Sequence, residues 1–218
     1  MVWKNTFIAI GATLLFVILF LFNIFVLQSR SYLQAEIERQ EIVIKDLKQT
    51  VQNMKELVVK KEKKLDALEN IVSKARKYQT SIELVLLVDQ KAEKYDLDGE
   101  IVYSLIAKES RFEPRAINYN SNGTVDRGLM QLNSRTAFWL AEKGRVAIED
   151  FRLSMLYEPE TNLELGLWYL KQLHNKYKDW SAALTAYNRG PGGLEKHYVR
   201  TGSFDSNYSN AILLSYQE

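Results

Sequence analysis

The sequence predicts an all-α protein made of a membrane-spanning helix, a coiled-coil stalk and a helical C-terminal domain. An apolar run without a charged residue covers positions 6–27, and a heptad pattern without Gly or Pro follows up to position 78. Beyond it the apolar residues recur at helical spacing, and no convincing strand alternation appears. We therefore expect an N-terminal tail at 1–5, an anchor at 6–27, a stalk at 28–78 and one domain at 79–218.

The composition excludes several functional classes. The net charge is +2, but basic residues outnumber acidic ones only before residue 80, and the reverse holds after it. An acidic domain disfavours nucleic-acid binding, because phosphate contacts need a basic face. The chain has no cysteine, and its two histidines, His174 and His197, are not at a metal-ligand spacing. We expect no metal site and no cofactor.

The apolar segment at residues 6–27 has the properties of a transmembrane helix. At ~1.5 Å per residue it is long enough to cross a ~30 Å hydrocarbon core. A cleaved signal peptide is the alternative, but the run is longer than a usual signal core and no cleavage-type sequence follows it. We expect an uncleaved signal anchor. Lys4 weakly favours a cytoplasmic N-terminus, which Arg30 on the other flank partly offsets.

The stalk segment carries apolar residues at the a and d positions of successive heptads, which is typical of a parallel coiled coil. Only Gln40 and Lys61 interrupt this seam, and such polar residues can fix the register at a cost in stability. The alternative is a single amphipathic helix that packs back on the domain. The seam positions are Leu33, Ile37, Gln40, Ile44, Leu47, Val51, Met54, Val58, Lys61, Leu65, Leu68, Val72 and Ala75.

The C-terminal domain is expected to contain several helices joined by short loops. Residues 118–128 are dense in turn-forming residues and predict a loop, after which a helix is expected to begin at Gly128. Gly190, Pro191 and Gly192 are expected to end another helix. The expected helices cover residues 81–95, 98–112, 128–144, 161–177, 179–189 and 206–218.

The helix at residues 98–112 carries the main candidate for chemistry. Asp98 can cap its start, and Pro114 forces the chain out of the helix soon after. Glu109 follows the apolar stripe of this helix at spacings of three, four and seven residues, which predicts a carboxylate on the buried face. Partial burial and the helix C-terminus both disfavour the anion, so we expect a raised pKa. The alternative is an ordinary glutamate that reaches water or pairs with a basic neighbour.

Four sequence patterns together resemble the soluble lytic transglycosylase domain, a lysozyme-like fold of bacterial peptidoglycan lyases. Glu109-Ser110 with Phe112, Pro114 and Ala116 resembles its catalytic motif, and Gly128-Leu-Met-Gln131 resembles its second motif. Asn162 to Leu170 resembles its N-x3-G-x2-YL helix, and residues 186–192 resemble its A-Y-N-x-G-P-G motif. Each pattern alone is weak. The four occur in the family's order over nearly the whole domain.

The resemblance implies roles for individual side chains. Glu109 is implied to be the general acid, Met130 to line the cleft, and Tyr187 to orient Glu109 through its hydroxyl. Gln131 and Asn188 are implied to contact sugar or peptide amides. The substrate-binding candidates are Ser110, Asn118, Met130, Gln131, Tyr187 and Asn188. Asn118 replaces a serine found in many members, although its amide can still donate a hydrogen bond.

These observations predict a membrane-anchored lytic transglycosylase whose domain faces the cell wall. The expected reaction cleaves the β-1,4 bond between N-acetylmuramic acid and N-acetylglucosamine and leaves 1,6-anhydromuramoyl ends. A hydrolytic muramidase that uses Glu109 and Asp126 is one alternative, although capping of a helix or pairing with Arg127 is the favoured role for Asp126. A non-catalytic coiled-coil membrane protein that binds glycan is the other. The expected partners are glycan strands, further copies of the chain and, from the long loop before Gly128, secretion or conjugation machinery.

Overall fold

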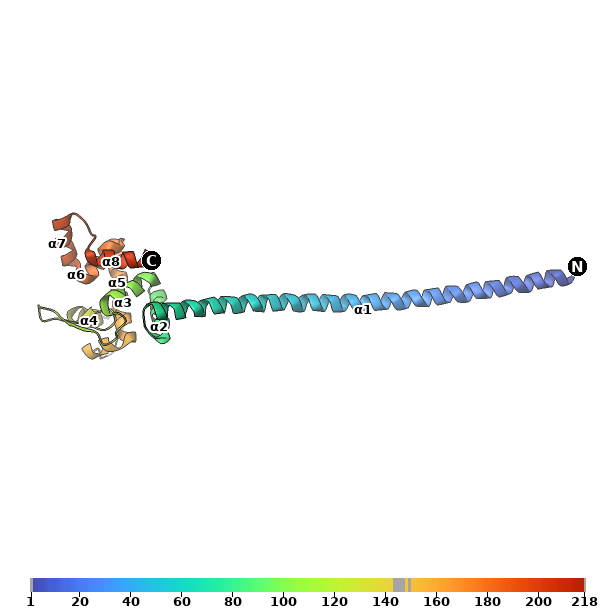
Figure 1. The fold of residues 1–218 in the computed structure, drawn as a ribbon, viewed down its shortest axis with the longest axis horizontal. Helices are drawn as coiled ribbons and strands as arrows, with labels where there is room; N and C mark the ends of the chain where they lie inside the picture. Colours follow the sequence, from blue (N-terminus) through green and yellow to red (C-terminus); the bar gives the residue numbers. More distant parts are fainter. Residues whose placement is uncertain (1, 143–147, 149, 218) are drawn as a thin grey trace. The chain divides into compact units, whose positions relative to one another are not determined.

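The computed structural model describes residues 2–142, 148 and 150–217, and it divides into two compact units. The first unit is Met1–Asp66 and the second is Ala67–Glu218. The first unit contains most of helix α1 (Val2–Lys77), which is continuous through the anchor and stalk segments (Figure 1).

From Leu14 to Leu65, helix α1 exposes most of its large apolar side chains. It is the one helix among the described residues that is long and apolar enough to cross a membrane, and a signal sequence would satisfy the same criterion. In the stalk segment, the seam residues Leu47 and Val51 are 56% and 49% exposed. No described residue of the same chain covers the seam residues of the first unit, up to Leu65, so this part of the seam is free to contact another helix.

The last turns of α1 belong to the second unit. Ile71 and Ala75 pack against the core of the domain, and the Lys74 ammonium donates a hydrogen bond to Asp89 over 2.8 Å. The Tyr78 ring stacks on Tyr103 with centroids 5.0 Å apart. The compact unit therefore begins at Ala67, whereas the sequence pattern placed the start of the domain at residue 79.

The domain is helical, as predicted, and the expected helices around Glu109 and near the C-terminus are present. Helix α3 packs against α2 and α8, and α5 packs against α2 and α6. The helices are α2 (Ile82–Lys94), α3 (Gly99–Ser110), α4 (Ser134–Glu142), a 3-10 helix η1 (Leu153–Tyr157), α5 (Pro159–Tyr177), α6 (Trp180–Arg189), α7 (Pro191–Thr201) and α8 (Asn207–Gln217).

One expectation about the helix boundaries was wrong. The helix expected from Gly128 begins only at Ser134, because Gly128 and Gln131 have positive φ angles of 78° and 45° that no α-helix allows. Helix α6 ends at Arg189, as expected, and its C-cap is Gly190. Pro191 also begins α7, where a proline at the first position costs no hydrogen bond.

A small antiparallel sheet occupies the segment that was expected to be a loop. Its strands are β1 (Ile117–Tyr119), β2 (Val125–Arg127) and β3 (Leu132–Asn133), in the order β1-β2-β3. Asn118 lies opposite Asp126, and Asp126 lies opposite Asn133. Strands of two or three residues are too short to show an alternating pattern, so the sequence did not reveal them. The sheet forms one side of the site described next.

Candidate active site

Helix α3 places Glu109 one residue before its own end. The Asp98 side chain caps the helix by accepting a hydrogen bond from the Glu100 amide over 2.9 Å, as predicted. The helix ends at Ser110, because the next two residues, Arg111 and Phe112, have left-handed φ angles of 54° and 61°. The stripe that precedes Glu109 is buried in the core, so the carboxyl group is directed toward the interior of the domain.

The carboxyl group of Glu109 keeps its proton up to a higher pH than an ordinary glutamate. Burial is the main cause, and together with the nearby charge of Asp126 it raises the pKa of Glu109 to about 7. The Tyr208 hydroxyl of α8 donates a hydrogen bond to Glu109 Oε1, and this bond and Lys108 oppose the rise in pKa. The environment therefore gives a carboxylic acid the pKa that a general acid needs.

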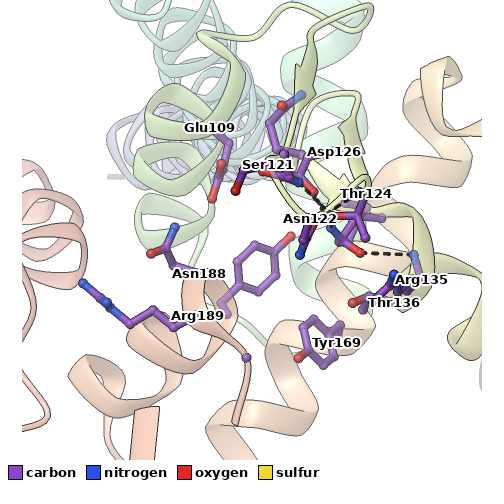
Figure 2. Close-up of a pocket in the computed structure, with 16 residues that line it drawn as sticks. Glu109, Ser121, Asn122, Thr124, Asp126, Arg135, Thr136, Tyr169, Asn188 and Arg189 are labelled. Carbon is purple, nitrogen blue, oxygen red and sulfur yellow. Dashed lines mark hydrogen bonds between the residues drawn. The ribbon is translucent and has the colours of Figure 1, made fainter. Parts of the chain in front are cut away.

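Two adjoining cavities, of about 520 Å³ and 510 Å³, meet at Glu109. Figure 2 shows the first, with Glu109 entering from α3 and Asp126 from the sheet. Most of the side chains around it are polar, which suits a ligand rich in hydroxyl and amide groups. The residues that line both cavities are Glu109, Asn120, Asp126, Gln131 and Asn188.

The turn at Gly128–Gln131 is held in place by Asn162 of α5. The buried Asn162 amide donates to the carbonyls of Arg127 and Leu156 over 2.9 and 2.8 Å, and its oxygen accepts from the Met130 amide over 2.8 Å. A Cβ atom on Gly128 would lie 2.2 Å from Asn162 Nδ2, so only glycine fits there. The polar Asn162 side chain is thus fully used in shaping the cavity wall.

Gln131 lines both cavities, as expected, but its amide group is already committed. Its Nε2 donates to the Ala116 and Gly128 carbonyls over 3.0 and 2.9 Å, which uses both N–H groups. The carbonyl oxygen Oε1 remains able to accept a hydrogen bond from a ligand. Asn188, by contrast, is exposed at the end of α6 and lines both cavities. Its amide is available as donor and acceptor.

The expected role of Met130 as a cleft residue was wrong. Met130 is fully buried, and it packs so closely on Gly166 of α5 that a Cβ atom there would lie 2.4 Å from its sulfur. Its function is to join the turn to α5. A larger residue at position 166 would therefore displace the Met130 side chain.

The hydroxyl group expected to orient Glu109 comes from a different tyrosine. Tyr187 of α6 lines the first cavity, but its hydroxyl donates to the Met130 carbonyl over 2.9 Å. Tyr208 of α8 contacts Glu109 instead. The sequence offered no signal for Tyr208, because it lies 99 residues from Glu109 in a segment outside the recognised motifs.

Asp126 is not a helix cap, in contrast to the favoured expectation. It lies in β2, eight residues before α4 begins at Ser134, and its carboxylate accepts hydrogen bonds from Asn133 Nδ2 over 2.7 Å and Asn118 Nδ2 over 3.4 Å. Arg127 does not pair with it but bonds the Val125 carbonyl. The sheet turns the Asp126 carboxylate into the cavities that contain Glu109.

The remaining candidates lie at the second cavity. Asn118 lines it from β1 and bonds Asn120 over 3.1 Å in addition to Asp126. Ser110 also borders it, but the residue is buried and its hydroxyl donates to the Ile106 carbonyl within α3. No group of three or more His, Cys, Asp or Glu residues suited to a metal ion occurs in the described part of the chain.

The sequence profile of the transglycosylase SLT domain matches residues 86–210. This match covers more than half of the chain and includes every residue that lines the two cavities. The chain belongs to the transglycosylase SLT family. Within this SLT domain, Glu109, the Gly128–Gln131 turn and the α6 motif surround one site.

Curated relatives share this SLT domain. Membrane-bound lytic murein transglycosylase C of Haemophilus ducreyi is 31% identical over 149 residues, which cover 63% of this chain and 37% of that protein. Invasion protein IagB of Salmonella typhimurium is 32% identical over 115 residues, which cover 50% of this chain and 69% of that protein. The chain thus spans only about a third of the length of the first of these relatives.

A solved structure shares the fold of the SLT domain. The 70 kDa soluble lytic transglycosylase Slt70 of Escherichia coli superposes with a TM-score of 0.50 and 19% identity, over 60% of this chain and 22% of that protein. This likeness, together with the observed helices, confirms the expected lysozyme-like all-α domain.

Proposed function

We propose that this protein is a peptidoglycan lytic transglycosylase that cleaves the β-1,4 bond between N-acetylmuramic acid and N-acetylglucosamine. Membership of the SLT family and the names of the curated relatives support this activity. The observation that carries the proposal is Glu109, a carboxylic acid with a pKa of about 7 at the meeting point of two polar cavities. Such a group can protonate a glycosidic oxygen near neutral pH.

In the proposed reaction Glu109 acts first as an acid and then as a base. The protonated carboxyl group gives its proton to the glycosidic oxygen as the bond to the muramoyl C1 breaks. The resulting carboxylate takes the proton of the muramoyl 6-hydroxyl, whose oxygen bonds to C1. The product is a 1,6-anhydro ring, no water is consumed, and Glu109 regains its proton. The intramolecular attack is favoured by a high effective molarity.

Neighbouring side chains support this cycle. The Tyr208 hydroxyl holds one oxygen of Glu109 in place. Asn188 and the Gln131 oxygen are placed to contact hydroxyl and acetamido groups of the sugars, and Asn118 extends this set in the second cavity. Ser110 and Tyr187 contribute to the cavity walls rather than offering free hydroxyl groups, because both hydroxyls bond backbone carbonyls.

The same proposal assigns residues 6–27 as a single-pass membrane anchor with the catalytic domain on the extracytoplasmic side. The apolar character of α1 supports an anchor, and the location of peptidoglycan outside the membrane determines the side. We further propose that copies of the chain associate through the stalk. A role beside secretion, conjugation or other envelope-spanning machinery is proposed from the long loop before Gly128.

The proposed activity is tested by incubating the full chain, purified in detergent, with insoluble peptidoglycan. We expect the wild-type protein to release soluble muropeptides and Glu109→Gln to release none above background. A neutral amide keeps the size of the side chain but has no acidic proton to give. Glu113→Gln, which changes a glutamate just beyond α3, is the matched control and is expected to retain activity. Release of fragments by Glu109→Gln at a rate near wild type would contradict the assignment.

A further inference from the structure

Asp126 occupies a position that the single-carboxylate reaction leaves unexplained. It lies at the centre of the small sheet, opposite Asn118 of β1 and Asn133 of β3. It lines both of the cavities that Glu109 lines, and Figure 2 shows the two carboxyl groups entering the first cavity from different elements. A carboxylate that only stabilised the sheet would have no need to face this cavity.

The sheet fixes the orientation of the Asp126 carboxylate. Oδ1 accepts a hydrogen bond from Asn133 Nδ2 over 2.7 Å, and Oδ2 accepts one from Asn118 Nδ2 over 3.4 Å. Each oxygen is thus bonded to a different neighbouring strand. Amide donors stabilise a carboxylate and leave its negative charge in place, whereas a lysine or arginine would neutralise that charge.

Asp126 also lacks a cationic partner. None of the ion pairs found among the described residues includes it, although the adjacent Arg127 could have supplied one. The Arg127 guanidinium instead bonds the Val125 carbonyl of its own strand. An oriented anion without a counter-ion, in a cavity beside a general acid, can interact with positive charge that develops in a ligand.

We propose that Asp126 is a second catalytic carboxylate that stabilises positive charge at the muramoyl C1 and neither forms a bond nor takes a proton. The inference rests on the proposed function. As the bond from C1 to the glycosidic oxygen breaks, the ring oxygen and C1 share a positive charge until the 6-hydroxyl oxygen bonds to C1. The proton cycle stays with Glu109, and the Asp126 charge is the same before and after the reaction.

A second consequence follows for Glu109. The groups that face its carboxyl are Asp126 from β2, Tyr208 from α8 and Tyr187 from α6, with Lys108 on its own helix. Asp126 is the one anion among these groups, and its charge disfavours a second anion nearby, which helps to raise the pKa of Glu109. Removing this charge must therefore lower the pKa at which Glu109 loses its proton.

The test compares Asp126→Asn, Asp126→Glu and the wild type as full-length proteins on soluble glycan strands, with kcat and KM measured from pH 5 to 9. We expect Asp126→Asn to lower kcat about 100-fold with little change in KM, as for loss of one preorganised group. The alkaline limb of the pH profile of kcat for Asp126→Asn should move to lower pH. Asp126→Glu, which keeps the charge, should recover part of kcat and keep the wild-type limb. Arg127→Gln, a loss of one charge in the same strand, should match the wild type.

The products separate the remaining outcomes. The inference about Asp126 would be wrong, and the proposed function would stand, under one combination of results. In it the wild type produces anhydro ends, and Asp126→Asn has a kcat within threefold of wild type and an unmoved alkaline limb. Wild-type products with free reducing ends that are lost in Asp126→Asn would show instead that Asp126 activates water. If the wild type releases no fragments from glycan, the proposed function itself fails. A loss of kcat without a shift in the limb, in both Asp126 variants, would indicate a structural role and contradict the proposal.

Discussion

The acid character of Glu109 comes from its neighbours. Burial and the charge of Asp126 raise its pKa to about 7, while the hydrogen bond from Tyr208 acts in the opposite direction. The sequence could predict the burial, because the helical period places Glu109 on the stripe of its own helix. It could not predict Tyr208 as a neighbour, and it offered Asp126 only as an alternative, because both contacts depend on the packing of segments distant in sequence.

Tyr208→Phe tests the contribution of the hydroxyl group. The hydrogen bond favours the charged form of Glu109, so its loss should raise the pKa of Glu109. Because the acid must be protonated, activity is present below this pKa and is lost as the pH rises through it. We expect the alkaline limb of kcat/KM to move to higher pH, with about a 10-fold lower maximum from poorer orientation.

The direction of this shift is the informative result, because it is opposite to that expected for Asp126→Asn. Tyr198→Phe, which removes an exposed hydroxyl outside both cavities, is the control and should leave the pH profile unchanged. A Tyr208→Phe profile that coincides with the wild type would show that the hydroxyl does not act on Glu109 in solution.

At the level of elements, the turn between β2 and β3 carries more of the site than its sequence suggests. The pattern of helix-forming residues predicted a helix from Gly128, but the Asn162 side chain and the packing of Met130 on Gly166 impose a turn. Long, periodic segments such as α3 and α5 were predictable from the sequence. The turn and the three short strands were not, since contacts distant in sequence decide them.

A pair of glycines tests this interpretation of the turn. Gly128 and Gly123 have nearly equal φ angles of 78° and 79°, but a Cβ on Gly128 would lie 2.1 Å from the Leu156 carbonyl oxygen, whereas Gly123 faces open space. Gly123→Ala should cost about 1 kcal/mol of unfolding free energy from its backbone angle alone. Gly128→Ala should cost about 3 kcal/mol or more, because backbone atoms must also move.

Denaturant unfolding of the two variants measures this difference. Equal losses for the two substitutions would mean that the backbone angle alone matters and that the close packing around Gly128 does not occur.

The stalk of α1 presents an apolar seam to solvent. The C-terminal end of this seam is not available to a partner helix. Ala75, the last seam position expected from the heptads, packs on the core of its own domain. We therefore expect the coiled coil to end near Leu68. The a positions are mostly Ile and Val and several d positions are Leu, a combination that favours two parallel strands.

Single cysteines test the seam, since the chain has no cysteine of its own. Leu47→Cys lies at a d position, so under mild oxidation it should form a covalent dimer of the full chain in detergent. Gln49→Cys lies on the outer face of the same turn and should stay monomeric. Dimer formation by both variants to the same extent would indicate random collision. If neither variant formed a dimer, the coiled coil would be contradicted and the single amphipathic helix would be favoured.

At the scale of the whole molecule, the sequence predicted the order of the parts and the class of the domain better than the boundary between them. The apolar run and the heptads are long, periodic signals, and the structure contains one continuous helix over both. The boundary shifted to Ala67 because Ile71 and Ala75 serve the core of the domain, which a repeating pattern cannot show. The four motifs marked the site, although two of the implied roles, those of Met130 and Tyr187, changed once the packing was known.

The central claim is that Glu109 alone carries the proton cycle and that the substrate's own hydroxyl group closes the ring. Mass spectrometry of the fragments released from peptidoglycan by the full-length protein tests this most directly. We expect 1,6-anhydromuramoyl ends as the main product, lighter by one water than the hydrolysis product. Free reducing ends as the main product would contradict it.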